Sequence, residues 1–465
     1  MSFLIVLAAL CFLMWIAYRG HSVILFAPVA ALGAVLLTDP SLVAPMFTGL
    51  FMEKTAGFLK LYFPVFVLGA VFGKLIELSG FSKSIVTAAI RVFGKQRAML
   101  SIVAVSALLT YGGVSLFVVV FAVYPFAAEL FRQADIPKRL IPGTIALGAF
   151  TFTMDALPGT PQIQNIIPTS FFGTNAWAAP WLGLVGAVFI LVLGLSYLEW
   201  RRRAALAKGE GYGSGHGNEP APFTGEHLPS PLLALLPLLL VGISNKWFTS
   251  AIPKLYGESH SFDPAVIGSA APVVQEVAKV SAIWAVQAAL LIGILSVIAL
   301  AWKPVMAAFA DGTKSAIGGA LLASMNTASE YGFGAVIAAL PGFLVVANAL
   351  SAIPNPLVNE AVSVTALAGI TGSASGGMSI ALAAMAETFI ANANAAGIPM
   401  EVLHRVAAMA SGGMDTLPHN GAVITLLAVT GLTHRQSYGD IFAITLIKTS
   451  AVFVVIAVHL ATGLV

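Results

Sequence analysis

The chain has few charged residues and a single cysteine, and both shortages limit what it can be. Charged residues make up 9% of its 465 residues, whereas soluble domains carry about a quarter. This composition excludes an ordinary soluble domain. The single cysteine, Cys11, excludes an intrachain disulfide and a metal site built from several cysteines.

Signatures of nucleotide-binding and metal enzymes are also missing. The sequence contains no Gly-x-x-x-x-Gly-Lys-Ser/Thr phosphate-binding loop and no His-Glu-x-x-His motif. We therefore expect no ATPase activity in this chain, no cofactor and no bound metal, and we do not expect an enzyme. The net charge of +3 is small, and the basic residues lie in short loops, so nucleic acid is not an expected partner.

Apolar sequence is what the chain has in abundance. Hydrophobic residues make up 58% of it, and a membrane-spanning helix needs about 20 apolar residues. The length then allows roughly a dozen spans. We expect a multi-pass protein of the cell inner membrane, in contact with the lipid bilayer. The first residues lack the basic region of a signal peptide, which favours a retained span over residues 2–18.

Three sequence elements occur twice, in the same order. They are a Gly-Gly-x-Ser element (Gly112–Ser115 and Gly376–Ser379), an Ile-Pro turn (Ile136-Pro137 and Ile398-Pro399) and a Met-Asp-x-Leu-Pro segment (Met154–Pro158 and Met414–Pro418). Duplicated apolar segments broken by Gly and Pro are typical of secondary transporters. The chain is therefore predicted to consist of two repeats.

The apolar segments and their basic flanks predict where each repeat begins and ends. Basic flanks on both sides of a Gly-Gly segment favour a re-entrant hairpin, and paired prolines favour a broken helix. Counting spans against the basic loops puts the two hairpins on opposite faces of the membrane, so the repeats are predicted to be inverted. The predicted order is a first repeat 1–203 with a hairpin at about 98–131 and a broken helix at about 138–176, a cytoplasmic linker 204–229, and a second repeat 230–465 with an interfacial stretch 333–352, a hairpin at about 357–395 and a broken helix at about 400–430.

The hairpin tips are the first candidates for substrate binding. Irregular backbone at membrane depth is tolerated where it lies inside the protein or lines a wet cavity. Glycine pairs expose backbone amides, and a following helix N-terminus suits a carboxylate. The candidates are Gly112, Gly113 and Ser115 in the first tip and Ser375, Gly376, Gly377 and Ser379 in the second. The alternative interpretation is that the glycines only allow close helix packing.

The helix breaks supply the other candidates. Asp155 and Asp415 are ionisable groups at membrane depth, where a charge is costly, so each is a proton-coupling candidate or else a helix N-cap. His419 is a third proton-coupling candidate, with a structural hydrogen bond as the alternative. The hydroxyls and amides expected to bind the substrate are Thr160, Gln162 and Asn165 in the first break and Thr416 and Asn420 in the second.

Two segments resemble the gluconate permease family of the ion transporter superfamily. They are Leu109–Val119, which contains Tyr111-Gly112-Gly113-Val114-Ser115, and Ile76–Gly80. The resemblance covers essentially the whole chain. It implies an all-α polytopic fold with inverted repeats, each with a re-entrant hairpin and a broken helix. It also implies a homodimer with scaffold and transport domains, and elevator-type symport of an organic acid anion with protons.

The first break departs from the gluconate carriers, which have a sequence rich in His and Pro there. This chain has Asp155-Ala156-Leu157-Pro158-Gly159-Thr160-Pro161-Gln162. The substrate class therefore stays open between a gluconate-like sugar acid and a short hydroxy acid such as 3-hydroxybutyrate. A sodium-coupled di- or tricarboxylate symporter on the same fold is the main alternative. A remote one is an intramembrane serine hydrolase using Ser115 with His419.

Overall fold

The computed structural model describes residues 2–19, 21–94, 97–114, 116–220, 228–263, 273–343, 345, 353–418 and 420–465. Nearly all regular structure in these residues is helical. The helices of the first half are α1 (Ser2–Tyr18), α2 (Val23–Thr38), α3 (Val43–Met46), α4 (Glu53–Leu78), α5 (Phe81–Phe93), α6 (Ala98–Tyr111), α7 (Leu116–Gln133), α8 (Ile141–Ala149), α9 (Phe152–Asp155), α10 (Ile163–Phe172) and α11 (Pro180–Ala207), with shorter turns at Pro40–Leu42, Phe47–Met52 and Lys138–Leu140.

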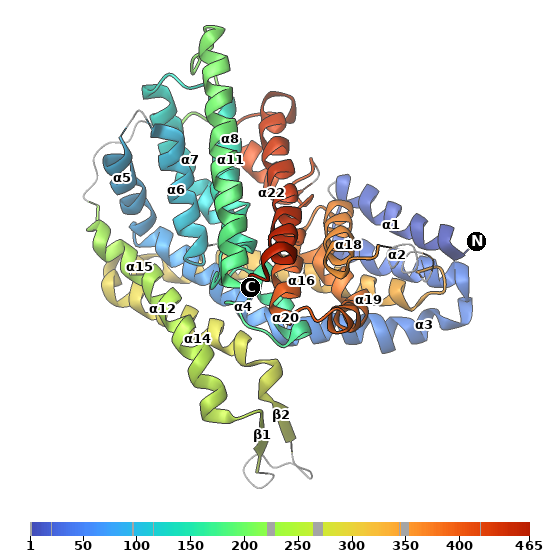
Figure 1. Cartoon of the computed structure of the whole chain (residues 1–465). Helices are drawn as coiled ribbons and strands as arrows, with labels where there is room; N and C mark the ends of the chain where they lie inside the picture. The colour runs from blue at the N-terminus through green and yellow to red at the C-terminus, as the bar shows by residue number, and fades with distance from the viewer. Residues whose placement is uncertain are drawn as a thin grey trace.

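The second half has the same succession of a hairpin, a broken helix and a long final helix. Its elements are α12 (Pro231–Tyr256), β1 (Ser259–Phe262), β2 (Val273–Glu276), a turn at Val277–Lys279, α14 (Ser281–Leu300), α15 (Trp302–Ala307), α16 (Phe309–Ala339), α18 (Pro356–Thr371), α19 (Ala374–Ala395), α20 (Met400–Ser411), α21 (Gly421–Thr430) and α22 (His434–Thr462). Strands β1 and β2 pair antiparallel with Ser259 opposite Glu276, and they project away from the helices (Figure 1).

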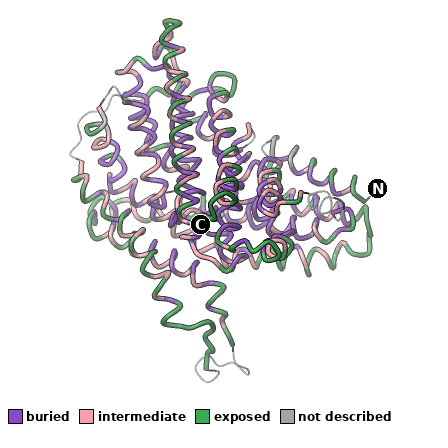
Figure 2. The backbone as a smooth tube through the Cα atoms, in the orientation of Figure 1, coloured by how far each residue is buried: buried purple, intermediate pink, exposed green. Residues whose placement is uncertain are grey.

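Six described helical segments are long and apolar enough to cross a membrane. They are Pro40–Leu78, Pro180–Leu206, Pro231–Tyr256, Ser281–Leu300, Ala374–Ala395 and His434–Thr462. Large apolar side chains are exposed along α11 and α12, for example Trp181, Val188, Leu232 and Ile243, whereas every residue of α8 is buried. Figure 2 shows exposed residues along the outside of the helices and buried ones between them. An exposed apolar surface of this kind suits lipid, and the protein is an integral membrane protein.

Pairs of packed helices lie at the two positions where hairpins were predicted. α6 packs on α7, and α18 packs on α19. A glycine with positive φ lies at each turn, Gly113 at +97° and Gly372 at +66°, a conformation that few other residues adopt without strain. Asn355 caps the start of α18, and Ser373 caps the start of α19.

Two predicted boundaries differ from the structure. The stretch 333–352 was expected to be interfacial, but α16 continues to Ala339, with Phe333, Val336 and Ile337 buried. The helix continues because it packs between α4 and α19, which cover its apolar side chains. Residues 344 and 346–352 lie outside the described residues. The linker was expected to begin at 204, but α11 runs to Ala207. Ion pairs of Glu199 with Arg202 and Arg203 stabilise the last turns of this helix.

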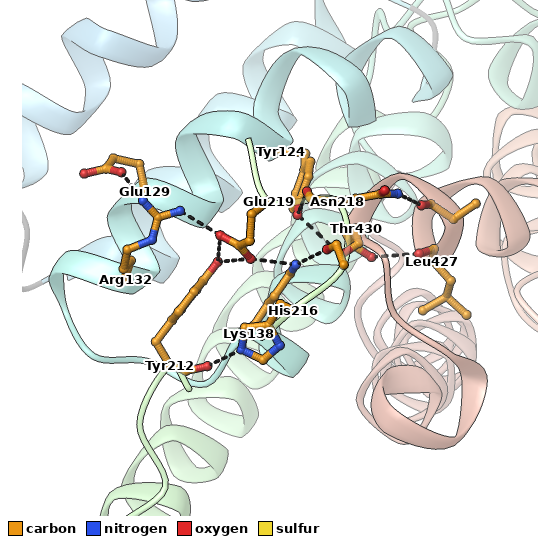
Figure 3. A network of polar contacts seen from close by, with 12 residues as sticks. Tyr124, Glu129, Arg132, Lys138, Tyr212, His216, Asn218, Glu219, Leu427 and Thr430 are labelled. Carbon is orange, nitrogen blue, oxygen red and sulfur yellow. Dashed lines mark hydrogen bonds and ion pairs between the residues drawn. The ribbon is translucent and has the colours of Figure 1, made fainter. Parts of the chain in front are cut away.

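The described part of the linker is held by a polar network that joins the two halves (Figure 3). The Lys138 ammonium, fully buried, donates to Glu219 Oε1 and to the Gly217 carbonyl, each at 2.8 Å. Tyr124 of α7 donates to the Asn218 carbonyl at 2.7 Å, and the Asn218 amide donates to the carbonyl of Ala428 in α21 at 2.8 Å. We call residues 210–219 with these partners the linker latch.

Charge balance holds the linker latch together. Partial burial opposes ionisation of Glu219, but hydrogen bonds from Lys138, Arg132 and Tyr212 outweigh it and hold the pKa of this carboxyl below its usual range. A hydrogen bond from Arg139 at 2.6 Å lowers the pKa of Glu210. Both carboxyls are therefore ionised at neutral pH.

Candidate functional site

The first break separates α8 from α10 and folds into the protein. Gly159 has φ of +80° and lies against the Trp177 ring, and Pro158 and Pro161 prevent a continuous helix. Asn165, fully buried at the start of α10, donates to the carbonyls of Thr160 and Ala176 at 3.0 and 2.9 Å. Its amide therefore fixes the loop that leads into and out of α10.

A side-chain amide ties each break to the hairpin tip of its own half. Gln162 Nε2 donates to the Thr110 carbonyl, at the end of α6, at 2.7 Å. Asn420 Nδ2 donates to the Gly372 carbonyl, in the tip between α18 and α19, at 2.8 Å, while its Oδ1 caps α21 through the amide of Val423. The two predicted site residues thus have equivalent positions in the two halves.

A buried ion pair joins the two breaks to each other. The ammonium of Lys448, in α22, lies 2.5 Å from Asp415 Oδ1 in the second break and donates to the Phe150 carbonyl in the first at 3.0 Å. The Asp155 carboxyl lies against Gly412, where a Cβ would overlap Oδ2, and it interacts electrostatically with both Lys448 and Asp415. The structure therefore brings Asp155 and Asp415 into one polar centre.

A second cation completes this centre. Arg405, at 0% exposure, donates to the Asp155 carbonyl at 2.7 Å, to Asn165 Oδ1 at 3.1 Å and to the Ala178 carbonyl at 2.7 Å. Its neighbour His404 is bonded to Thr174 Oγ1 at 2.6 Å and to Asn165 Oδ1 at 3.2 Å. The centre therefore contains two carboxyls and two basic side chains.

Sequence reasoning did not place Lys448, Arg405 or His404 in the site. Lys448 is a cation well inside the last apolar span, a position that usually has a functional or structural reason. Arg405 follows the Ile-Pro turn at the start of the second broken helix, where the loop count predicts no cytoplasmic charge. Basic residues at these two positions of apolar helices could have indicated the site from the sequence.

The remaining predicted site residues fall into two groups. Thr160 Oγ1 and Ser379 Oγ are buried and have no hydrogen-bond partner among the described residues. Thr416 Oγ1 lies 2.5 Å from Thr445 Oγ1, and Ser375 Oγ lies 3.3 Å from Thr327 Oγ1. Ser115 and His419 lie outside the described residues, so the structure gives no geometry for a Ser-His pair.

The glycines of the tips have different surroundings. A Cβ at Gly112 would overlap Leu238 of α12, and one at Gly377 would overlap the backbone of Ala368 in α18, so both allow close packing. Gly376 instead faces the carboxyl of Glu330 in α16. The amides of Gly112 and Gly113 donate to helix carbonyls at 3.0 Å, and that of Gly376 donates to Ser373 Oγ at 3.0 Å. A carboxylate at these amides would have to displace those acceptors.

A cavity of about 810 Å³ opens beside the first tip. Tyr111 and Gly112 of the tip form one side, and α12 forms another with Lys246 and Lys254, both basic. The Lys246 ammonium lies 4.7 Å from the centre of the Trp177 ring, which also lines the cavity. The Trp177 indole N–H is buried and has no acceptor among the described residues. The charged groups that line the cavity are therefore positive.

In the part of the chain that the structure describes, no cluster of side chains is suited to metal binding. No three His, Cys, Asp or Glu side chains there lie together in a way that would hold a metal ion.

Comparison with known proteins shows similarity to a curated transporter and, more distantly, to solved structures. No protein-family model matches the chain. It is similar to the uncharacterized transporter YxjC of Bacillus subtilis (strain 168), with 61% identity over 474 residues and 100% of each chain covered. It is also similar, at 15% identity and a TM-score of 0.49, to the crystal structure of the Alcanivorax borkumensis YdaH transporter, described as having an unusual topology; 92% of this chain and 90% of that one are covered.

Proposed function

Because this chain belongs to the family of the Bacillus subtilis transporter YxjC, we propose that it is a secondary carrier that moves a small hydroxylated organic acid anion together with protons. The substrate is a gluconate-like sugar acid or a short hydroxy acid such as 3-hydroxybutyrate. Resemblance to the gluconate permease family suggests this class, and the cavity beside the first tip supports it.

The observation that carries the proposal is the charge of that cavity. Both charged residues that line it, Lys246 and Lys254, are cationic, and a cation attracts a carboxylate. The substrate carboxylate meets Lys246 and the unpartnered Trp177 N–H. Its hydroxyls meet the hydroxyls of Tyr111 and Ser250, which line the same cavity.

The polar centre between the breaks supports a structural role in addition to this binding. Asp155 and Asp415 lie near two basic side chains, Arg405 and Lys448, and cations beside the carboxyls oppose the binding of sodium there. We propose that it joins the two breaks into one transport domain. The equivalent tip contacts of Gln162 and Asn420 support two repeats, and we propose that these are inverted and comprise residues 1–203 and 230–465, with 204–229 as a cytoplasmic linker. We also propose that the protein is a homodimer of the inner membrane and that it works by elevator movement.

The test is uptake of labelled gluconate and 3-hydroxybutyrate into proteoliposomes that contain the full chain. Each acid is offered first with an imposed proton gradient and then with a sodium gradient. We expect accumulation with the proton gradient and, for Lys246→Met, a strongly raised KM. Uptake that follows sodium alone would support the di- or tricarboxylate alternative instead. Ser379→Ala is expected to weaken uptake, since its hydroxyl is buried and unpartnered by described groups.

A further inference from the structure

Glu330 is a buried acid in α16 to which neither the breaks nor the cavity gives a partner. The residue is 3% exposed, and its Oε2 has no hydrogen-bond partner among the described residues. No described charged group interacts with it electrostatically. A buried carboxylate without a counter-ion is strongly disfavoured. The group therefore holds a proton in this arrangement of the helices.

Charged residues do occur on the elements that pack against α16, but they do not reach Glu330. These elements are α2, α4, α15, α19 and the turn at Phe47–Met52. Their charged residues are Glu53, Lys54, Lys60, Lys74 and Glu77 of α4, Lys303 of α15 and Glu387 of α19. None of them contributes to the electrostatic environment of Glu330. An ionised Glu330 would therefore need contact with water to stabilise its charge.

The carboxyl of Glu330 lies directly against the second hairpin tip. A Cβ at Gly376 would overlap Oε2, so this position needs a glycine. One helical turn earlier, Thr327 Oγ1 lies 3.3 Å from Ser375 Oγ, which precedes Gly376. The tip that is expected to close over substrate thus rests on a buried acid and a pair of hydroxyls.

The two aspartates of the breaks differ from Glu330 in this respect. Asp415 is paired with Lys448 at 2.5 Å, and Asp155 interacts with Lys448 and Arg405. A neighbouring cation stabilises the ionised form of a carboxyl, and Glu330 has no such neighbour among the described residues. Of these three acids, Glu330 is the one that lies against the second tip and has no described charged group beside it.

We propose that Glu330 is the residue that carries the transported proton, an inference that rests on the proposed proton-coupled function. Its carboxylate takes a proton from water on one side of the membrane, which allows the tip to pack on the neutral carboxyl. After the transport domain has moved, the tip lifts and the carboxyl returns the proton to water on the other side. Closure of the second tip without a proton is blocked, because it would bury the bare charge against Gly376.

The test compares Glu330→Gln with the wild-type chain in proteoliposomes. Glutamine keeps the shape of a protonated glutamate but cannot release a proton. Exchange of labelled for unlabelled gluconate or 3-hydroxybutyrate needs no net proton movement and is expected to persist. A gradient of one pH unit drives about tenfold accumulation in a one-proton symporter, and the variant is expected to lose all of it.

Glu360→Gln is the matched control. Glu360 lies in α18 of the same half, is 0% exposed and has two carboxyl oxygens without a described partner, but it does not lie against the tip glycine. It is expected to keep proton-driven accumulation. Accumulation retained in Glu330→Gln, or lost in Glu360→Gln alone, would overturn the inference and leave the proposed function standing. A wild-type chain that ignores the proton gradient would overturn both.

A spectroscopic readout covers the case in which Glu330→Gln does not fold. Glu330→Asp keeps a carboxyl group but draws it back from the tip by one methylene. The infrared band of a protonated carboxyl in the wild-type protein is expected to shift in this variant and to persist at neutral pH. If no such band shifts, Glu330 is ionised in the folded protein and the inference is wrong.

Discussion

Lys448 and Asp415 form a buried ion pair, with 2.5 Å between the ammonium and Oδ1 and side-chain exposures of 2% and 13%. Because the same ammonium also donates to the Phe150 carbonyl, removing it affects both breaks. We expect Lys448→Met to destabilise the protein by about 3–5 kcal/mol, since it leaves a carboxylate buried without a counter-ion. The apparent melting temperature in detergent measures this.

The double variant Lys448→Met/Asp415→Asn should recover much of that loss, because it removes the orphaned charge. Lys314→Met, at an exposed position of α16, is the control and is expected to leave the melting temperature unchanged. A Lys448→Met protein as stable as the wild type would show that the pair does not hold the breaks together.

The Asn420 side chain both caps α21 and contacts the second tip, and substitutions can separate these two roles. Asn420→Asp keeps the oxygen that caps α21 but removes the amide that donates to the Gly372 carbonyl, and Asn420→Ala removes both. We expect both variants to reduce uptake, and the alanine variant to lose about 1 kcal/mol more stability, the usual contribution of an N-cap. Gln162→Glu should reduce uptake in the same way through the first tip. Normal uptake in all three would contradict the assigned tip contacts.

Gly377 allows α18 and α19 to approach closely, and a methyl group there would strike the Ala368 backbone. We expect Gly377→Ala to destabilise the protein by about 1–3 kcal/mol through overpacking. Gly319→Ala, in α16, is the matched control, because nothing lies within 4 Å of where the added Cβ would be. This variant should be as stable as the wild type or more stable by about 1 kcal/mol, because alanine favours a helix more than glycine does. Equal melting temperatures in the two variants would contradict close packing of the hairpin.

The linker latch should respond to acid. The pKa of Glu219 is lowered from 4.5, so its contribution is fully present above about pH 4.5 and is lost as the pH falls through the lower folded value. Hydrogen exchange at residues 210–219, corrected for intrinsic rates, should therefore rise on acidification. Glu219→Gln should weaken the latch at neutral pH and flatten this response. Glu258→Gln, in the exposed turn before β1, should leave exchange in the latch unaltered.

The sequence predicted the helices well because apolar length and proline or glycine breaks are local properties. The first hairpin turn and the two breaks fall where Gly112-Gly113, Pro158 and Pro418 indicate, but the second hairpin turns at Gly372, and Gly376-Gly377 lie in the first turns of α19. It failed at residues 333–339, where packing between α4 and α19 extends a helix that composition alone would end. Burial by distant segments is not visible in a local window.

The site was predicted in part for a similar reason. Gln162 and Asn420 were found because they lie inside the breaks themselves. Lys448 and Arg405 reach the breaks from α22 and α20, and Glu330 reaches the second tip from α16. Pairing across such distances depends on how helices are arranged in space, which one sequence does not specify.

The asymmetry of the central cations has a consequence for biosynthesis. Both Lys448 and Arg405 come from the second half, yet they satisfy the carbonyls of Phe150, Asp155 and Ala178 in the first. Arg405 is 250 residues after Asp155, so at ordinary translation rates the first break waits roughly 10–50 s for its partner. During that interval the nascent first half needs water, lipid headgroups or an insertion factor at its break. Its final shape is reached only after the last helix has entered the membrane.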